Sequence, residues 1–398
     1  MTSLARQVCS SFTAVLSLGL LVACATAPRD FEAVTAEAAL PSAPAPNESL
    51  FAGTSPIPEP ETLIELSPQQ KADFLVYFHS EAAQSLPQHH RIRQYLEQKL
   101  RGFGYLEATL TASEALAQHR GNCASLAALT LALADLVGIE THFQLMTTAP
   151  VFDRESGLIL SSNHVRSRVY DPDYEPTPGK LSLLRPHVLI DYFPGDRLGR
   201  GAPLSRAEFL ALIYRNLAAD ALIAGDLDRA FALSRAALAL DPDHADSLNL
   251  MAVIHRRAGD LQSAEDFYRY AIVLHDNQVN LLSNYENLLR RQGRHSEADK
   301  IESRLARLDD PNPFHWLDLG ERARQRGSLH TALRWYGEAL ERAPYLHEAY
   351  WRQAIVYQAL GQPDRSMAAL KKAHSLTRHA NIKERYQAKL YGLRADHN

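Results

Sequence analysis

The stretch HRGNCASLAALTLALADLVGI, residues 119–139, contains a cysteine in a position that could support covalent chemistry. Gly121 permits a sharp turn and Asn122 is a good N-cap, so we expect Cys123 in the first turn of an apolar helix that Gly138 ends. The dipole and the unsatisfied amide groups at a helix N-terminus favour a thiolate, which is the nucleophilic form of cysteine. The alternative interpretation is that Cys123 is a small residue of the hydrophobic core.

The N-terminus has the features of an export signal. One positive charge, Arg6, precedes an apolar run over residues 12–23 that is too short to span a membrane. The segment LVAC, residues 21–24, resembles the lipobox of bacterial lipoproteins. That resemblance implies cleavage after residue 23 and attachment of lipid, palmitate included, to Cys24. The alternative is a plain signal peptide cleaved near Ala25.

Removal of residues 1–23 would leave Cys123 without a partner for an internal disulfide. The chain has three cysteines, of which Cys9 lies in the signal peptide and Cys24 would carry lipid. A single remaining thiol in an oxidising compartment is a candidate reactive group. Ala25 after the lipidated cysteine resembles the sorting signal of outer-membrane lipoproteins, which implies the cell envelope and the periplasmic face of the outer membrane.

Length and composition indicate a multidomain protein. The 398 residues are enough for two or three domains, and the net charge of −4 gives no basic footprint for nucleic acid. Residues 24–66 are rich in Pro, Ala, Glu, Ser and Thr, and this composition predicts a flexible tether between the lipid and the folded part.

The C-terminal half repeats with a period of 34 residues. The repeat is marked by five glycines, each followed five residues later by a small residue: Gly225, Gly259, Gly293, Gly327 and Gly361. Glycine permits the turn between two helices, and small residues let the helices approach closely. The pattern resembles the tetratricopeptide repeat (TPR), which predicts five helix pairs over residues 207–378 stacked as an all-α solenoid. Residues 379–398 are expected to form a capping helix and tail.

A solenoid of this kind presents a groove lined by the first helix of each pair. The polar residues expected at groove positions of copies two and three are Asn249, Arg256, Asn287 and Arg290. They predict binding of an acidic or peptide partner, with a solvated polar face as the alternative.

Residues 67–200 combine a central helix with candidate strands. Thr111 and Glu114 form a capping-box pattern for a short helix that runs to Gln118. Three later segments have strand character: THFQLM from residue 141, NHVRSRVYD from residue 163 and HVLIDYF from residue 187. The expected fold is α+β, with the Cys123 helix packed on an antiparallel sheet.

The order of Cys, then His on a strand, then Asp on the next strand resembles the transglutaminase-like fold of the papain-like cysteine enzymes. The nucleophile segment EALAQHRGNCASLAALTLALADLVGI, the histidine strand NHVRSRVY and the aspartate segment LIDYFP carry this resemblance. It implies that Cys123 is the nucleophile, His164 its base and Asp191 the orienter of the histidine. Gln118 is a candidate oxyanion donor. Asp171 is an alternative orienter because the insertion before Asp191 is long.

Two functions stay open for the whole chain. One is a lipid-anchored thiol enzyme, a cysteine peptidase or transglutaminase-like hydrolase, that cleaves or transfers an amide or peptide acyl group while the repeats recruit a protein partner or substrate. The other is a non-catalytic envelope scaffold with a degenerate pocket. No cofactor is expected, and four of the histidines in this domain show no metal-ligand spacing: His89, His90, His119 and His187.

Overall fold

The computed structural model describes eight stretches of the chain: residues 42–53, 56–101, 104–105, 108–155, 158–175, 185–192, 201–308 and 312–377. The signal peptide, Cys24 and the expected cap at 379–398 lie outside them, and so do the side chains of residues 147–164. Within the described chain, no helix has both the length and the apolarity needed to cross a membrane.

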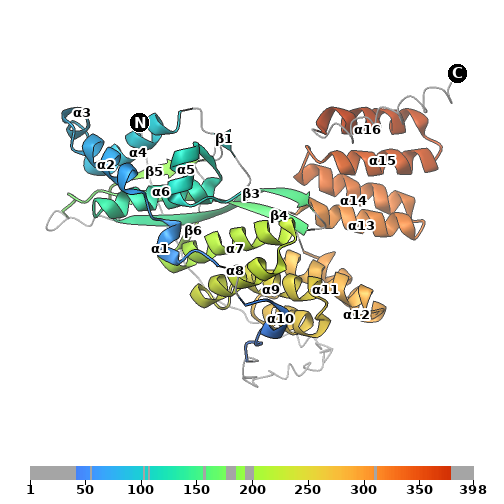
Figure 1. Ribbon diagram of the computed structural model, residues 1–398. Coiled ribbons are helices and arrows are strands. Elements are labelled where there is room, and N and C mark those ends of the chain that lie inside the picture. Colours follow the sequence, from blue (N-terminus) through green and yellow to red (C-terminus); the bar gives the residue numbers. More distant parts are fainter. Residues whose placement is uncertain are drawn as a thin grey trace, which may run out of the picture. The chain divides into compact units, whose positions relative to one another are not determined.

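Short helices come first in the chain (Figure 1). They are the 3-10 helix η1 (Glu48–Leu50), α1 (Pro60–Leu63), α2 (Pro68–Phe78), α3 (Glu81–Gln84) and α4 (Gln88–Lys99). The side chain of Ser67 accepts from the N–H of Gln70, whose own side chain accepts from the N–H of Ser67, so α2 begins with a capping box. Phe74 of α2 and Tyr95 of α4 are buried against each other, with ring centroids 5.0 Å apart.

The expected tether is shorter than predicted. Phe51, Leu63, Ile64 and Leu66 are buried, although composition predicted a flexible segment as far as residue 66. Large apolar residues are sparse in this Pro- and Ala-rich segment. Burial of these four side chains is favourable, and it holds the backbone around them in place. The described chain from Asn47 onward is therefore part of the folded body.

Two helices behave as the capping signals predict. They are α5 (Ala112–Gln118) and α6 (Cys123–Leu136). Thr111 and Glu114 form the expected capping box, and the Asn122 side chain accepts from the N–H of Ser125. All residues of α6 from Cys123 to Ala134 are buried, so this helix is the centre of the α+β part.

Four strands form an antiparallel sheet in the order β5-β4-β3-β6. Their bounds are β3 (Thr141–Glu155), β4 (Leu158–Tyr170), β5 (His187–Asp191) and β6 (Ala202–Leu204). Two short strands pair separately and in parallel, β1 (Gly104–Tyr105) and β2 (Arg120–Gly121). The three candidate strands of the sequence are thus present, the first two extended into a long hairpin.

One face of the sheet packs against α6. Every second side chain of β4 faces α6. These side chains are fully buried and belong to Val165, Ser167 and Val169. Opposite them on β5, Val188 pairs with Val169 and Ile190 with Ser167. The intervening residues of both strands belong to the other face.

Five helix pairs follow, as the 34-residue period predicts. They are α7 (Arg206–Ala224) with α8 (Leu227–Leu240), α9 (Ala245–Arg257) with α10 (Leu261–Leu274), α11 (Val279–Arg291) with α12 (His295–Leu305), α13 (Pro313–Gln325) with α14 (Leu329–Arg342), and α15 (His347–Ala359) with α16 (Pro363–Leu376). All five glycines of the period adopt a positive φ between 68° and 92°. That conformation is accessible to glycine and strained for other residues, which explains its recurrence.

The buried apolar residues of the array do not form one continuous core. One cluster runs from the α+β part through the first three copies and ends at Ala298. A second begins at Phe314 in copy four, and a third holds Ala354 and Leu370 of the last pair. Charged side chains lie between the first two clusters, as described below.

Candidate functional site

Cys123 is the first residue of α6 and is 6% exposed. The preceding residue, Asn122, is held in place because its side-chain amide donates to Thr109 Oγ1 at 2.7 Å. The hydroxyl of Ser125 donates to Asn122 Oδ1 and accepts from the N–H of Leu110 at 2.8 Å. This buried polar cluster fixes the helix N-terminus, so the thiol sits on a rigid support.

Tyr192, which sequence reasoning passed over, ties the helix to the sheet. Its hydroxyl donates to Thr130 Oγ1 at 2.6 Å, and its oxygen lies 2.8 Å from Ser167 Oγ. Burial raises the pKa of Tyr192, and the nearby Cys123 and Asp191 raise this pKa further. The only local signal in the sequence was two polar residues, Thr130 and Ser167, at positions that otherwise read as apolar core.

His164 and Asp191 lie on adjacent strands. Asp191 pairs with Arg166, and His164 stands two residues before Arg166 on β4. Diagonal neighbours of this kind have Cα atoms about 7–8 Å apart and belong to the same face of the sheet. That face is opposite to the one that packs on α6, which carries Val165 and Ser167. The side chain of His164 lies outside the described residues, so its pairing with Cys123 stays a prediction.

The backbone near His164 is irregular. His164 pairs with Met146, but the next pair is Val151 with Ser162, so β3 carries extra residues at this point. Bulges re-aim side chains and are common beside active sites. Because β3 begins shortly after α6 and pairs there with Val169, the C-terminal end of α6 lies near the Val169 end of β4.

Asp171 lies at the other end of β4. It follows the last strand residue, Tyr170, and stands seven positions after His164, a distance of about 23 Å at the usual rise per residue. Its carboxylate instead lies 3.5 Å from Nδ1 of His89. The structure therefore separates the alternative orienter from His164.

Gln118 ends α5 and is exposed. Its Oε1 accepts from Nε of Arg120 at 2.9 Å. His119, the next residue, adopts a left-handed conformation with φ of 52°. Among the described residues no group of three or more His, Cys, Asp or Glu is arranged to hold a metal ion.

The four groove candidates have different surroundings. Asn249 accepts from the side-chain amide of Asn284 at 2.9 Å, a contact that joins copies two and three. Asn287 is exposed and accepts from Nε of Arg291 at 3.1 Å. Arg256 is partly buried, and its Nε is buried without a hydrogen-bond partner in the part of the chain that the structure describes.

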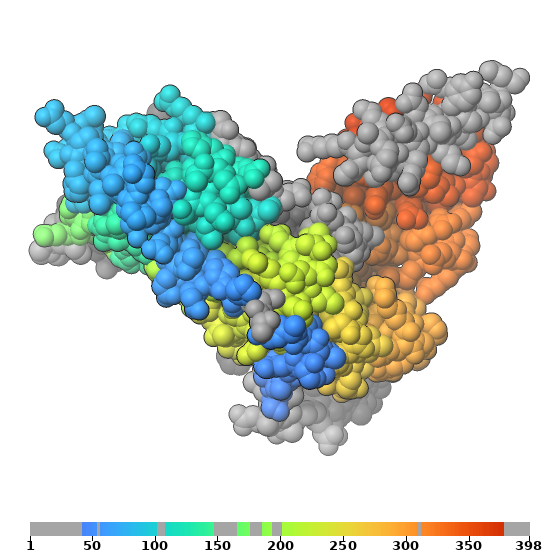
Figure 2. Space-filling model, viewed as in Figure 1, coloured from blue at the N-terminus to red at the C-terminus, as the bar shows by residue number. Residues whose placement is uncertain are grey.

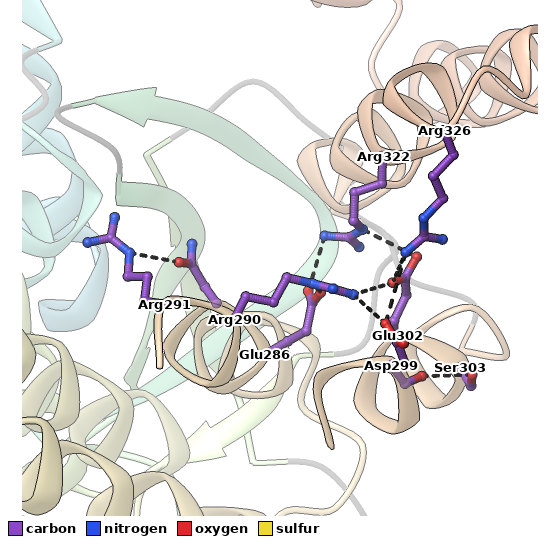
Figure 3. Close-up of polar contacts among 9 residues, drawn as sticks. Glu286, Arg290, Arg291, Asp299, Glu302, Ser303, Arg322 and Arg326 are labelled. Carbon is purple, nitrogen blue, oxygen red and sulfur yellow. Dashed lines mark hydrogen bonds and ion pairs between the residues drawn. The ribbon is translucent and has the colours of Figure 1, made fainter. Parts of the chain in front are cut away.

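Arg290 is held by three carboxylates (Figure 3). It contacts Glu286 at 2.5 Å, Asp299 at 3.0 Å and Glu302 at 2.5 Å. Glu286 lies on the same helix, whereas Asp299 and Glu302 belong to α12. The guanidinium of this predicted groove residue is therefore engaged within the protein.

The same carboxylates reach the next copy. Arg322 of α13 donates to Glu286 at 3.1 Å and lies 3.3 Å from Glu302, which also accepts from Arg326. Glu286 is only 3% exposed. We call the set Glu286, Arg290, Asp299, Glu302, Arg322 and Arg326 the charged junction, and it lies where the apolar core is interrupted.

Comparison with protein families identifies the helix pairs. Two tetratricopeptide repeat models match the chain, one over residues 221–271 and one over residues 347–379. No curated protein sequence is significantly similar to the chain.

Solved structures that match this chain cover a little under half of it. PilF of Pseudomonas aeruginosa is 19% identical over 47% of this chain and 85% of that chain, with a TM-score of 0.40. A thermophilic TPR protein of Thermus thermophilus is 17% identical over 46% of this chain and 99% of that chain, with a TM-score of 0.38. MamA of Desulfovibrio magneticus is 14% identical over 42% of this chain and 94% of that chain, with a TM-score of 0.32.

The family matches and the five glycine-linked helix pairs together establish that this chain carries tetratricopeptide repeats, a class of module that generally binds peptides or proteins.

Replacing Glu286 by Ala should destabilise copies three and four. The change leaves Arg290 and Arg322, each about three-quarters or more buried, facing one carboxylate fewer, and we expect a loss of about 2–4 kcal/mol. Urea unfolding followed by far-UV circular dichroism measures this loss. Asn287→Ala, at the exposed neighbouring position, is the control and should change stability by less than about 0.5 kcal/mol. Equal effects of the two substitutions would contradict a stabilising role for the junction.

Proposed function

We propose that the repeat array is a docking module that binds an acidic segment of a protein partner. The observation that carries this proposal is a difference between two arginines at the same repeat position. Arg256 and Arg290 are 34 residues apart, at the ends of α9 and α11. Arg290 contacts three carboxylates, whereas Arg256 contacts none among the described residues.

The difference follows from the residues that surround each arginine. The positions of Glu286, Asp299 and Glu302 are taken in copy two by Ala252, Glu265 and Tyr268, respectively. Glu265 binds Arg294 at 2.6 Å and accepts from Tyr285, so it is engaged elsewhere.

The hydroxyl of Tyr268 is buried without a hydrogen-bond partner in the described chain. Burial raises the pKa of Tyr268, and the nearby charge of Arg256 partly offsets this increase. Copy two therefore offers a cation where copy three has an ion pair. A carboxylate from a partner could form the charge-assisted, bidentate contact that the chain itself does not supply.

Arg256→Ala should weaken binding of acidic peptides. Loss of one charge-assisted contact predicts an affinity reduced by about 10–100-fold, because such bonds contribute about 1.5–3 kcal/mol. Asp- and Glu-rich peptides are first selected on a peptide array for binding to the chain lacking residues 1–24. Fluorescence anisotropy then measures the dissociation constant of each selected peptide for this chain and for the variant.

Arg291→Ala removes the same charge from an exposed position and is the matched control. If Arg256→Ala and Arg291→Ala weaken binding equally, general charge attraction explains the binding and the docking proposal is wrong at this residue.

A second function, thiol chemistry at Cys123, is favoured by the position of that residue at a rigid, buried helix N-terminus. The supporting geometry is the contact of α6 with the sheet through Tyr192, the neighbouring strand positions of His164 and Asp191, and the irregular register that follows the Met146–His164 pair. Because Asp191 belongs to the face that alternates away from α6, a Cys123–His164–Asp191 triad would have to meet at the end of the sheet. In this proposal a transglutaminase-like domain transfers or hydrolyses an amide acyl group, with Cys123 forming the thioester and His164 moving the proton.

The thiol proposal predicts an activated Cys123. In the chain lacking residues 1–24, alkylation should proceed well below the reference thiol pKa of about 8.5. His164→Ala and Asp191→Ala should remove this advantage, whereas Asp171→Ala, at the distant end of β4, should not. If the pH profile of alkylation is that of an ordinary thiol and none of the three substitutions changes it, the thiol proposal is wrong. The whole chain would then act as a non-catalytic scaffold.

We further propose that Cys24 carries lipid and holds the protein at the periplasmic face of the outer membrane. The lipobox-like LVAC segment supports this proposal. Labelled palmitate should be incorporated into the wild-type chain and not into Cys24→Ser, with Cys9→Ser as the control that keeps the label. Unchanged labelling of Cys24→Ser would exclude this anchor.

A further inference from the structure

The segment Asn47–Ala52 lies against the first two repeats, whose contacting residues come much later in the sequence. Figure 1 shows η1 beside α10, and Figure 2 shows the same N-terminal residues against the repeats. Phe51 stacks on Phe231 of α8 with ring centroids 4.0 Å apart and planes 6° apart, and its edge meets His255 at 5.6 Å. Phe51 is 8% exposed, so this aromatic side chain is the anchor of the segment.

Side chains of the repeats accept hydrogen bonds from both ends of the segment. The main-chain N–H of Asn47 donates to Nε2 of His255 at 3.1 Å, and its side-chain amide donates to Asp260 at 2.8 Å. The N–H of Ala52 donates to Asp228 at 2.9 Å. Such contacts recognise a peptide by its backbone N–H groups, while a pocket for one side chain provides specificity.

His255 is prepared to accept the hydrogen bond of a peptide. It is fully buried, and burial lowers its pKa, which favours the neutral ring. Nδ1 lies 2.9 Å from the carbonyl oxygen of Met251, so Nδ1 carries the proton and Nε2 is the acceptor. If the segment left, Nε2 would lose this partner, and the N–H of another peptide could replace it.

The exposed part of the segment adds a charge contact. Glu48 lies 3.0 Å from Arg235 of α8, and Leu50 is 43% exposed. The residues between the two anchors form a single 3-10 turn rather than a strand or long helix. Few interactions therefore hold the segment, and all of those described here are made with side chains of the first two repeats.

We propose that Asp228, Phe231, Arg235, His255 and Asp260 form a peptide-binding surface, which we call the α8–α10 site, and that Asn47–Ala52 occupies it as a ligand in cis. The partner that fits is a peptide with an Asn, an acidic residue directly after it and an aromatic residue four positions after the Asn. Covalent attachment gives the cis segment a high local concentration, so a partner must compete with it. The α8–α10 site does not use Arg256, and this inference stands independently of the acidic docking function.

A labelled synthetic peptide of residues 44–53, PAPNESLFAG, tests the proposal. The full chain with Asn47→Ala and Phe51→Ala has a weakened cis ligand and should bind the peptide at least 10-fold more tightly than wild type. The peptide carrying Phe51→Ala should bind this variant at least 10-fold more weakly. Adding Asp228→Ala, which removes the acceptor for the N–H of Ala52, should weaken binding several-fold.

Two results would overturn the proposal. The first is a variant that keeps the wild-type circular dichroism spectrum and binds the native and Phe51→Ala peptides equally weakly. Should the variant lose its fold, hydrogen exchange in the wild-type chain decides the question. The N–H groups of Asn47 and Ala52 should exchange faster than those of α9, by local release of the segment. Exchange as slow as in α9 would make the segment a permanent part of the fold and exclude an exchangeable site.

Discussion

Each helix pair of the repeat array has an apolar face that it cannot bury alone, and the arrangement of the protein follows from what covers that face. The first pair is covered by the α+β part, where Phe209 of α7 stacks on Phe143 of β3 with ring centroids 3.9 Å apart. Polar contacts strengthen the same junction, because Asp220 accepts from the N–H of Thr109 and Arg206 pairs with Asp135 at 2.8 Å. The two parts therefore share one hydrophobic core through the first three copies.

Charge replaces apolar contact where that core is interrupted. Glu286 is nearly fully buried and binds arginines from two successive copies, so the junction between copies three and four depends on ion pairs. A buried carboxylate is costly unless it is paired, so loss of either arginine would leave the charge of Glu286 less compensated. Copy two has Ala252 and Tyr268 where copy three has Glu286 and Glu302, and its one matching carboxylate, Glu265, pairs with Arg294. This difference among the described residues distinguishes Arg256 from Arg290.

The α+β part and the repeats suggest different kinds of function. Around Cys123, polar groups are buried and satisfied by one another: Asn122 by Thr109 and Ser125, and Tyr192 by Thr130 and Ser167. Such a network fixes the helix against the sheet, which is what a nucleophile or a rigid binding pocket requires. On the repeats, by contrast, Arg256 and the α8–α10 site present groups that another chain could satisfy.

The local features of this protein were determined by the sequence itself. Thr111 with Glu114, Asn122, and the five glycines act through main-chain geometry within a few residues, so the helix starts, the turns and the 34-residue period could be predicted. The partners of side chains could not be predicted in this way. Arg290 was assigned to the groove, but its carboxylates come partly from another helix, and the segment around Phe51 was assigned to a tether because its apolar residues are few. Only the tertiary structure brings Phe51 to Phe231, or separates Asp171 from His164 along a strand, because contacts between residues distant in sequence depend on how whole elements pack.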